Sequence, residues 1–196
     1  DHLGLAVALS SDAHVSALGE CTFGCAHGMK NFIVLSLGVG LGSCFFSEGS
    51  EHVGHLGFAG EFGHTCVVEN GRQCGCGQRG CLEAYAGANG IVRTAQELMA
   101  DTEAPSLMRD LTKLSPRTIF ECCEQGDKMA IEVFRRTGEI LGLGLANYAS
   151  IIDPEAIILT GGISHAGKWI VDPAYESYEA HVFGNLKGKV RILLSK

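Results

Sequence analysis

The sequence predicts an α/β fold, and three observations support this prediction. Residues 156–160 (AIILT) form a short apolar run typical of a buried strand, and two glycines at 161–162 end it. A helical stretch follows over residues 164–183, and a second apolar run occupies residues 190–194. Earlier in the chain, residues 31–47 read as two strands joined through glycines. Strand, helix and strand in this order are typical of α/β proteins.

The strongest helical signal covers residues 127–152, where apolar side chains recur on one stripe. Gly138, Gly142 and Gly144 are unfavourable in a helix, so we expect close packing against another element there. Other helices are expected after an N-cap at Ser11 or Asp12, over residues 82–100 with breaks near Gly87 and Gly90, and over residues 116–123.

The two ends of the sequence predict that the chain is a piece of a longer protein. There is no initiator methionine, and an apolar run of strand type, residues 3–9, begins at once. The run at 190–194 stops two residues before the end. Both read as strands of a sheet whose neighbours are missing.

Composition limits the class of protein. The chain has 196 residues, 46% of them hydrophobic, with a mean hydropathy of +0.17, which excludes a disordered chain. No run approaches the roughly 18 apolar residues of a membrane span, and no secretory leader is seen. A net charge of −7 argues against nucleic-acid binding. Nine cysteines without a leader argue against disulfides and for a reducing cytoplasm. The clustered Cys74, Cys76 and Cys81 indicate metal binding, and the scattered ones are read as small buried hydrophobes.

One cluster of residues has the composition of a zinc site. His64 is followed by Cys74, Cys76 and Cys81, and glycines between the cysteines let the backbone curl. Three thiolates and an imidazole make a closed tetrahedral donor set, which suits structural rather than catalytic zinc. The alternative is a set of free thiols in a glycine-rich loop.

Three carboxylates are candidates for ligand chemistry. Glu61 lies three residues before His64, and Glu83 lies two residues after Cys81, so a shared metal would bring the two acids together. Ionised carboxylates accept strong hydrogen bonds from hydroxyl groups, as a polyhydroxyl ligand requires. Asp12 follows the first apolar run and is placed like a catalytic carboxylate. Solvated surface acids and a helix N-cap are the alternatives.

Two glycine elements are candidates for nucleotide contacts. Gly38, Gly40 and Gly42 lie at the predicted hairpin turn, where backbone N–H groups can face a phosphate. Gly161 and Gly162 follow a buried strand at the sheet edge where α/β proteins bind nucleotides. A tight hairpin explains the first element equally well.

Together these motifs resemble the ROK family of sugar kinases and sugar-responsive repressors. The resemblance covers essentially the whole chain, and residues 59–64 (AGEFGH) followed by 74–83 (CGCGQRGCLE) are its most specific part. Within the family, residues 28–32 (GMKNF) and 71–77 (GRQCGCG) are most similar to bacterial glucokinases of the Bacteroides type.

The resemblance implies an actin-like, ribonuclease-H-like ATPase fold, with two α/β domains and sugar and ATP in the cleft between them. Residues 1–30 would be the end of the N-terminal domain and the interdomain region. Residues 31–196 would be the C-terminal domain, truncated at its end and carrying the zinc-stapled loop. A cytoplasmic homo-oligomer, a dimer, is expected.

The family's site residues carry over to matching positions of this chain. Asp12 would be the general base, and sugar-binding roles would fall to Ser11, Glu61, His64 and Glu83. His64 would be shared with structural Zn²⁺, whose other ligands would be Cys74, Cys76 and Cys81. ATP with Mg²⁺ would contact Gly38, Gly40, Gly42, Gly161 and Gly162.

Two departures from the family pattern affect the predicted activity. Ser11 stands where the family usually has Asn, and Val39 where it usually has Thr. The primary prediction is an ATP-dependent glucokinase that phosphorylates the 6-hydroxyl of glucose, although the fragment alone should be inactive. A sugar-sensing repressor with a separate DNA-binding segment is one alternative, and a zinc-stapled assembly module without a ligand is another.

Overall fold

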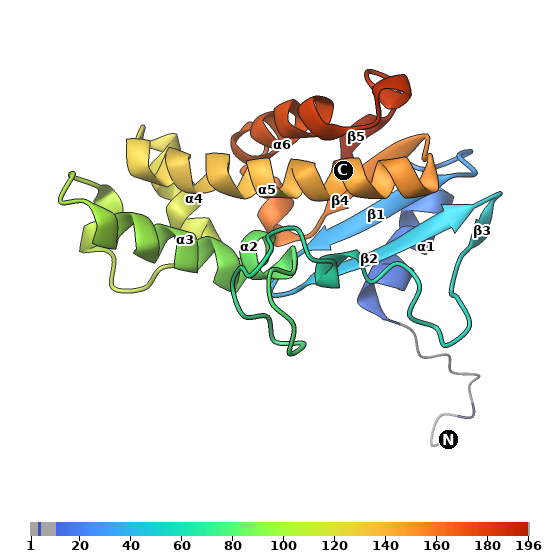
Figure 1. Ribbon diagram of the computed structural model, residues 1–196, viewed down its shortest axis with the longest axis horizontal. Coiled ribbons are helices and arrows are strands. Elements are labelled where there is room, and N and C mark those ends of the chain that lie inside the picture. The colour runs from blue at the N-terminus through green and yellow to red at the C-terminus, as the bar shows by residue number, and fades with distance from the viewer. Residues whose placement is uncertain (1–3, 5–10, 196) are drawn as a thin grey trace.

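A computed structural model describes residue 4 and residues 11–195 of the chain (Figure 1). Its centre is a five-stranded sheet in the order β3-β2-β1-β4-β5. The strands are β1 (Phe32–Leu37), β2 (Leu41–Ser47), β3 (Ser50–Glu51), β4 (Ala156–Thr160) and β5 (Arg191–Leu194). The predicted strand over residues 3–9 lies, apart from residue 4, outside the described residues.

The sheet is mixed. The first three strands pair antiparallel, and β1 pairs with β2 in a register that sets Leu37 opposite Leu41. β4 lies parallel to β1, and β5 lies parallel to β4. The turn at the carboxyl end of β1 and the segment after β4 therefore meet at one edge of the sheet. The predicted hairpin and the α/β strand order are confirmed.

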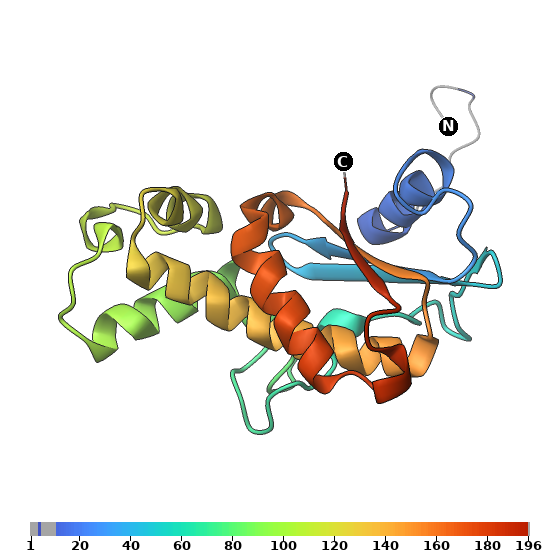
Figure 2. The same cartoon turned by 90° about the horizontal axis from the view of Figure 1, so that it is seen from above.

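Helices cover both faces of the sheet (Figure 2). On one face, α1 (Asp12–Phe23) packs through Ala17 against Phe32, Val34 and Cys44. The opposite face carries the larger core, against which α5 (Lys128–Ile152) and α6 (Lys168–His181) pack with their buried apolar side chains. The remaining helices are α2 (Glu83–Ala86), α3 (Ala88–Asp101) and α4 (Pro116–Glu124), with 3-10 turns η1 (Phe62–His64), η2 (Leu107–Asp110), η3 (Gly162–Ala166) and η4 (Gly184–Leu186).

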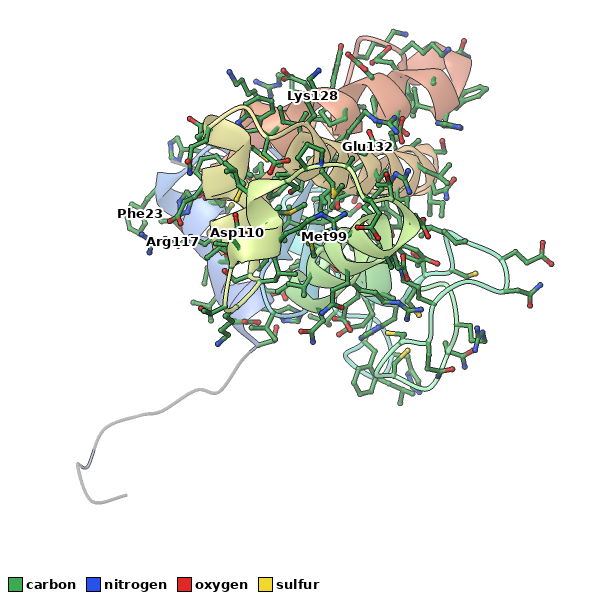
Figure 3. The ribbon with its side chains drawn as sticks, turned by 90° about the vertical axis from the view of Figure 1, so that its left-hand side faces the viewer. Phe23, Met99, Asp110, Arg117, Lys128 and Glu132 are labelled. Atoms are coloured by element: carbon green, nitrogen blue, oxygen red, sulfur yellow. The ribbon has the colours of Figure 1, made fainter. Side chains whose placement is uncertain are left out.

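A helical extension lies beyond one end of the sheet. It consists of α3, η2, α4 and the start of α5, and Figure 3 views it end-on with Met99, Asp110, Arg117 and Lys128 labelled. Local sequence explains its boundaries: Ser115 and Thr118 form a reciprocal capping box at the start of α4. No described helix meets the length and hydropathy needed to cross a membrane.

The glycines of α5 allow the close helix packing that the sequence predicts. A Cβ on Gly142 would lie 2.2 Å from the carbonyl oxygen of Ala174 on α6, and one on Gly138 would lie 2.6 Å from Pro173 Cγ. Real Cβ atoms do not approach a backbone atom so closely, so α5 and α6 touch backbone to backbone only because these side chains are absent.

Two boundary predictions are wrong. Residues 82–100 do break at Gly87, but Gly90 lies inside α3, where a Cβ would lie 2.7 Å from backbone atoms of Ala84 and Tyr85. The predicted helix from residue 164 to about 183 is also different, because α6 begins at Lys168 and ends at His181. Gly167, with φ of 55°, separates it from η3.

Candidate functional site

The Glu83 carboxylate packs against the backbone of the β1–β2 hairpin turn. Gly38 N–H donates to the carbonyl of Gly40 within the turn, at 3.0 Å. Glu83 Oε2 accepts from the backbone N–H of Leu41 at 3.0 Å, and a Cβ on Gly40 would lie 2.7 Å from the same oxygen. A side chain at position 40 would therefore displace the carboxylate. Gly40 is needed because Glu83 approaches the backbone of the turn.

Asp12 approaches the same hairpin from the other side. It is the first residue of α1, and the side chain of Ser11 caps the helix by accepting from His14 N–H at 3.3 Å. Asp12 Oδ1 would lie 3.7 Å from a Cβ on Gly42, and Ala13 Cβ would lie only 3.1 Å from it. The missing side chain at position 42 thus lets the start of α1 reach β2. Ser11 and Asp12 form the N-terminal cap region that the sequence predicts.

A cavity of about 310 Å³ collects most of the predicted site residues. Its polar lining includes the side chains of Asp12, Glu61, His64 and Glu83, and the glycines of the hairpin turn form its floor. The predicted residues that line this cavity are Ser11, Asp12, Gly38, Gly40, Gly42, Glu61, His64 and Glu83. The fold therefore brings Ser11 and Glu83, which are 72 positions apart in the sequence, to the same cavity.

Ser43 and Tyr148 hold the segment that carries Glu61. The Ser43 hydroxyl donates to the carbonyl of Gly60 and accepts from Phe62 N–H at 3.0 Å, so it bonds to both neighbours of Glu61. Tyr148, on α5, donates to the Phe62 carbonyl at 2.7 Å, and the two rings stack with centroids 4.3 Å apart. Burial raises the pKa of Tyr148 to about 12, so its hydroxyl stays protonated as a donor.

His64, Cys74, Cys76 and Cys81 converge as predicted. Their ligand atoms all lie within 4.8 Å of one another. Cys76 Sγ and Cys81 Sγ are 3.6 Å apart, and His64 Nδ1 is 3.7 Å from Cys74 Sγ. Two thiolates on one tetrahedral zinc, with Zn–S bonds of about 2.3 Å, would be separated by roughly 3.8 Å. The donor set and its spacing fit a zinc ion.

The electrostatics of the cluster agree with a role as cation ligands. Burial and the neighbouring thiols raise the pKa of Cys81 to about 12, while a hydrogen bond from the Gln78 backbone lowers that of Cys76. Without a cation, several thiolates this close repel one another. A divalent ion removes that repulsion and holds the thiols deprotonated.

Arg72 fixes the cysteine-rich loop, residues 65–81, to the helices behind it. Its guanidinium donates to the carbonyls of Ala84 and Gly90 at 3.2 and 3.0 Å and to Thr94 Oγ1 at 2.9 Å. The same group lies 4.7 Å from the ring centroid of Tyr85. Arg72 therefore joins the loop to α2 and α3, and α2 begins with Glu83.

A second cavity, of about 570 Å³, adjoins the first. Gly38 lines both, so the hairpin turn separates the two spaces. The other lining residues are Ser115, Pro116, Arg117, Phe120, Glu121, Phe134, Gly162, Ile163, His165 and Ala166. Gly162 was predicted here. Gly161 lies next to the space, where its φ of 87° and its close approach to Leu37 turn the chain after β4.

Sequence reasoning missed several residues that line or support these cavities. From the sequence, Ser43 belongs to a predicted strand and Tyr148 to the apolar stripe of a predicted helix, with no further signal at either position. Arg117 and His165 carried no recognisable motif. The only available signal was Pro116, which marked the start of α4 without indicating that this helix lines a cavity.

Comparison with known proteins identifies the family. A family model described as the ROK family matches residues 1–196. The chain belongs to the ROK family. It is 37% identical over 188 residues to a glucokinase from Streptomyces coelicolor, an alignment covering 93% of this chain and 59% of the relative. Membership of the Bacteroides-type branch stays a prediction.

Solved structures agree with the fold. The ROK family glucokinase from Streptomyces griseus, solved with glucose and AMPPNP, superposes with a TM-score of 0.89 at 34% identity. That match covers 99% of this chain and 64% of the glucokinase. The expected actin-like, ribonuclease-H-like ATPase fold is therefore confirmed.

Repressors of the family are similar as well. The chain is 28% identical over 189 residues to the xylose repressor of Bacillus subtilis, across 96% of this chain and 46% of the repressor. The chain thus spans about half to three fifths of the length of the curated relatives it matches. The proposed boundary between residues 30 and 31 stays a prediction.

Proposed function

We propose that this chain is part of an ATP-dependent sugar kinase that phosphorylates the 6-hydroxyl of glucose. The observation that carries the proposal is the pair of cavities that share Gly38. One is lined by carboxylates suited to a sugar, and the other is larger and more apolar, as a nucleotide base requires. The likeness to a glucokinase that holds glucose and AMPPNP supports the same assignment.

Asp12 is the proposed general base. Phosphoryl transfer needs a positioned acceptor that takes the hydroxyl proton and an arrangement that holds the phosphoryl group in line. Asp12 lies at the cavity next to Gly42, where the hairpin backbone approaches α1. Its carboxylate would remove the proton from the 6-hydroxyl as that oxygen attacks the γ-phosphorus of ATP.

The remaining sugar hydroxyls are proposed to be held by Ser11, Glu61, His64 and Glu83. Carboxylate oxygens accept strong hydrogen bonds from neutral hydroxyl donors. Glu83 has one oxygen committed to Leu41 N–H, so its position relative to the hairpin is fixed before a sugar binds. This preorganisation lowers the cost of ordering the site on binding.

The nucleotide is proposed to lie across the hairpin. Its phosphates would lie against Gly38, Gly40 and Gly42, and its adenosine near Gly161 and Gly162. Mg²⁺ bound with ATP would neutralise phosphate charge.

Zn²⁺ is proposed as a structural ion on His64 and the three cysteines, because four protein ligands leave no open position for chemistry. A cytoplasmic homo-oligomer stays a prediction.

One observation favours the sugar-sensing repressor as a second candidate. The Val39 side chain projects from the turn with 82% of its surface exposed and has no hydroxyl for a phosphate. Ser11, which stands in place of the family's usual Asn, accepts the helix-cap hydrogen bond from His14 N–H. Weak phosphate contacts with an intact sugar cavity would suit a sensor better than an enzyme.

Steady-state ADP release by the full-length protein tests the proposal. The assay would use ATP and Mg²⁺ with glucose, N-acetylmannosamine, fructose, allose and xylose in parallel. Sugar-dependent ADP release that is fastest with glucose is expected. Sugar binding by calorimetry without ADP release would instead establish the repressor reading, and neither binding nor release would contradict both.

A further inference from the structure

A second group of metal-ligand side chains lies at the β2–β3 edge of the sheet. His14 comes from α1, Cys44 from β2 and Glu51 from β3, and their ligand atoms lie within 4.8 Å of one another. His14 Nδ1 is 2.7 Å from Glu51 Oε1, and Cys44 Sγ is 3.6 Å from the same oxygen. Three donors of three chemical types therefore meet at one point.

This cluster is separate from the one formed by His64. Side chains alternate across a strand, so Cys44 shares with Gly42 the face of β2 that packs on α1. Leu41 and Phe45 point to the opposite face, where η1 and its His64 lie. The two clusters share no ligand, and β2 lies between them.

The surroundings of the cluster are those of a partly enclosed metal site. Cys44 is buried, with 1% of its surface exposed, whereas the side chains of His14 and Glu51 are 21% and 31% exposed. The Cys44 thiol is thus buried, whereas the neighbouring imidazole of His14 and carboxylate of Glu51 are partly exposed to solvent. The alternative is that His14 and Glu51 form only a hydrogen-bonded pair, but such a pair does not account for the Cys44 thiol placed next to the same carboxylate oxygen.

We propose that His14, Cys44 and Glu51 bind a second ion of the zinc class, with water as the fourth ligand. Nitrogen, thiolate and carboxylate donors together suit Zn²⁺ or Co²⁺ rather than Mg²⁺ or Ca²⁺. The 3.6 Å separation of sulfur and oxygen matches a tetrahedral ion, and the His14–Glu51 contact opens by roughly half an ångström to admit it. The Cys44 thiol releases its proton to solvent when the ion binds.

The proposed ion would join three elements of the fold. α1 packs on β2, and β2 pairs with β3 (Figure 1), so the ion would bond to one residue of each. Because α1 begins with Asp12, two residues before His14, occupancy would hold the start of this helix against the sheet. Three protein ligands and a water bind less tightly than four protein ligands, so this ion exchanges more readily than the one at His64.

Metal stoichiometry of the full-length protein tests the proposal. Wild type, Cys44→Ser, His14→Ala and the control Cys123→Ser would be stripped of metal, loaded with Zn²⁺ and freed of excess ion. Cys123 is a matched control because it is as buried as Cys44, at 1% exposure, and belongs to no cluster of metal ligands among the described residues. Loading with Co²⁺ adds a thiolate-to-metal absorption band as a spectroscopic readout.

We expect Cys44→Ser and His14→Ala each to hold one equivalent fewer than wild type, and Cys123→Ser to hold the same number as wild type. The Co²⁺ band should lose the contribution of a single thiolate in Cys44→Ser. This difference is independent of whether the His64 cluster or the kinase activity is as proposed. Unchanged stoichiometry in Cys44→Ser would overturn the proposal, as would an equal loss in Cys123→Ser.

Discussion

The α5–α6 pair and the cysteine-rich loop are stabilised in different ways. The helices bury apolar side chains and approach each other through Gly138 and Gly142. The loop is glycine-rich and mostly exposed, and polar contacts such as those of Arg72 hold it. Burial follows from hydrophobic pattern, but the geometry of the loop depends on individual hydrogen bonds and on the proposed zinc ion.

This difference matters because the loop lies between two predicted sugar ligands. Glu61 precedes it on the chain and Glu83 follows it. The helical core supplies the rigid support, through Tyr148 on α5 and through α3, which Arg72 contacts. Damage to the loop should therefore affect ligand binding, and damage to the helix pair should affect overall stability.

Removing the proposed zinc ion should have the largest effect. Structural zinc contributes roughly 10–16 kcal/mol of apparent binding energy in small zinc-dependent folds. Chelation, or Cys81→Ser, should abolish glucose binding and expose the loop to protease near Gly77, while most of the helical circular dichroism remains. The control is Cys66→Ser, an exposed thiol of the same loop outside the cluster. Unchanged glucose affinity after complete metal removal would contradict the account.

Gly142→Ala should destabilise the helix pair. Its new methyl would lie 2.2 Å from a backbone oxygen of α6, so the helices must separate at a cost of about 1–3 kcal/mol. Gly19→Ala on α1 adds the same methyl with nothing within 4 Å, so it should stabilise by about 0.5–1 kcal/mol. Urea unfolding measures both, and equal effects at the two positions would refute the close-packing argument.

Tyr148→Phe should have a smaller effect, directed at the site. It removes the donor to the Phe62 carbonyl but keeps the stacked ring, so about 1–2 kcal/mol of stability should be lost. Glucose affinity should fall because Glu61 is held less firmly. Tyr178→Phe is the matched control, because its buried hydroxyl has no hydrogen-bond partner among the described atoms. Calorimetric titration should find weaker glucose binding in the Tyr148 variant alone.

The smallest effect should come from acid titration on the outer face of α5. Hydrogen bonds from Arg135 and Arg136 lower the pKa of Glu132 from 4.5 to about 2. The ionised Glu132 carboxylate therefore contributes its full stabilisation of the fold above pH 4.5, the ordinary pKa of the side chain. This contribution is lost as the pH falls through about 2, the pKa in the folded protein. For partly exposed pairs the contribution is about 0.2–1 kcal/mol. Between those pH values, Glu132→Gln should lose less stability than wild type in urea unfolding; identical curves would exclude this contribution.

The helix pair and the hairpin could be predicted because their patterns are local. Residues 127–152 carry a helical stripe, and the structure places α5 over nearly the same residues. The break predicted at Gly90 was wrong because a glycine that weakens a helix can also be required for packing, here against Ala84. Likewise, the start of α6 depends on the positive φ of Gly167, which composition does not reveal.

The convergence of His64 with Cys74, Cys76 and Cys81 could be predicted because all four lie within 18 residues and form a specific donor set, whereas zinc itself stays a prediction. The contribution of Tyr148 could not, because it is 86 residues from Phe62 and meets it only through the packing of α5 on η1. The same holds for His165, which lines the second cavity together with Arg117 only because α4 and η3 are neighbours. Such contacts depend on tertiary arrangement.

The most direct test of the proposed kinase is the Asp12→Asn variant of the full-length protein. The amide keeps the size of the side chain and the acceptor for Ala13 N–H, but it cannot take a proton. Glucose affinity by calorimetry should stay within a few-fold of wild type, while ADP release should fall about 10²–10⁴-fold. Undiminished ADP release with unchanged glucose affinity would contradict the assignment of Asp12 as the general base.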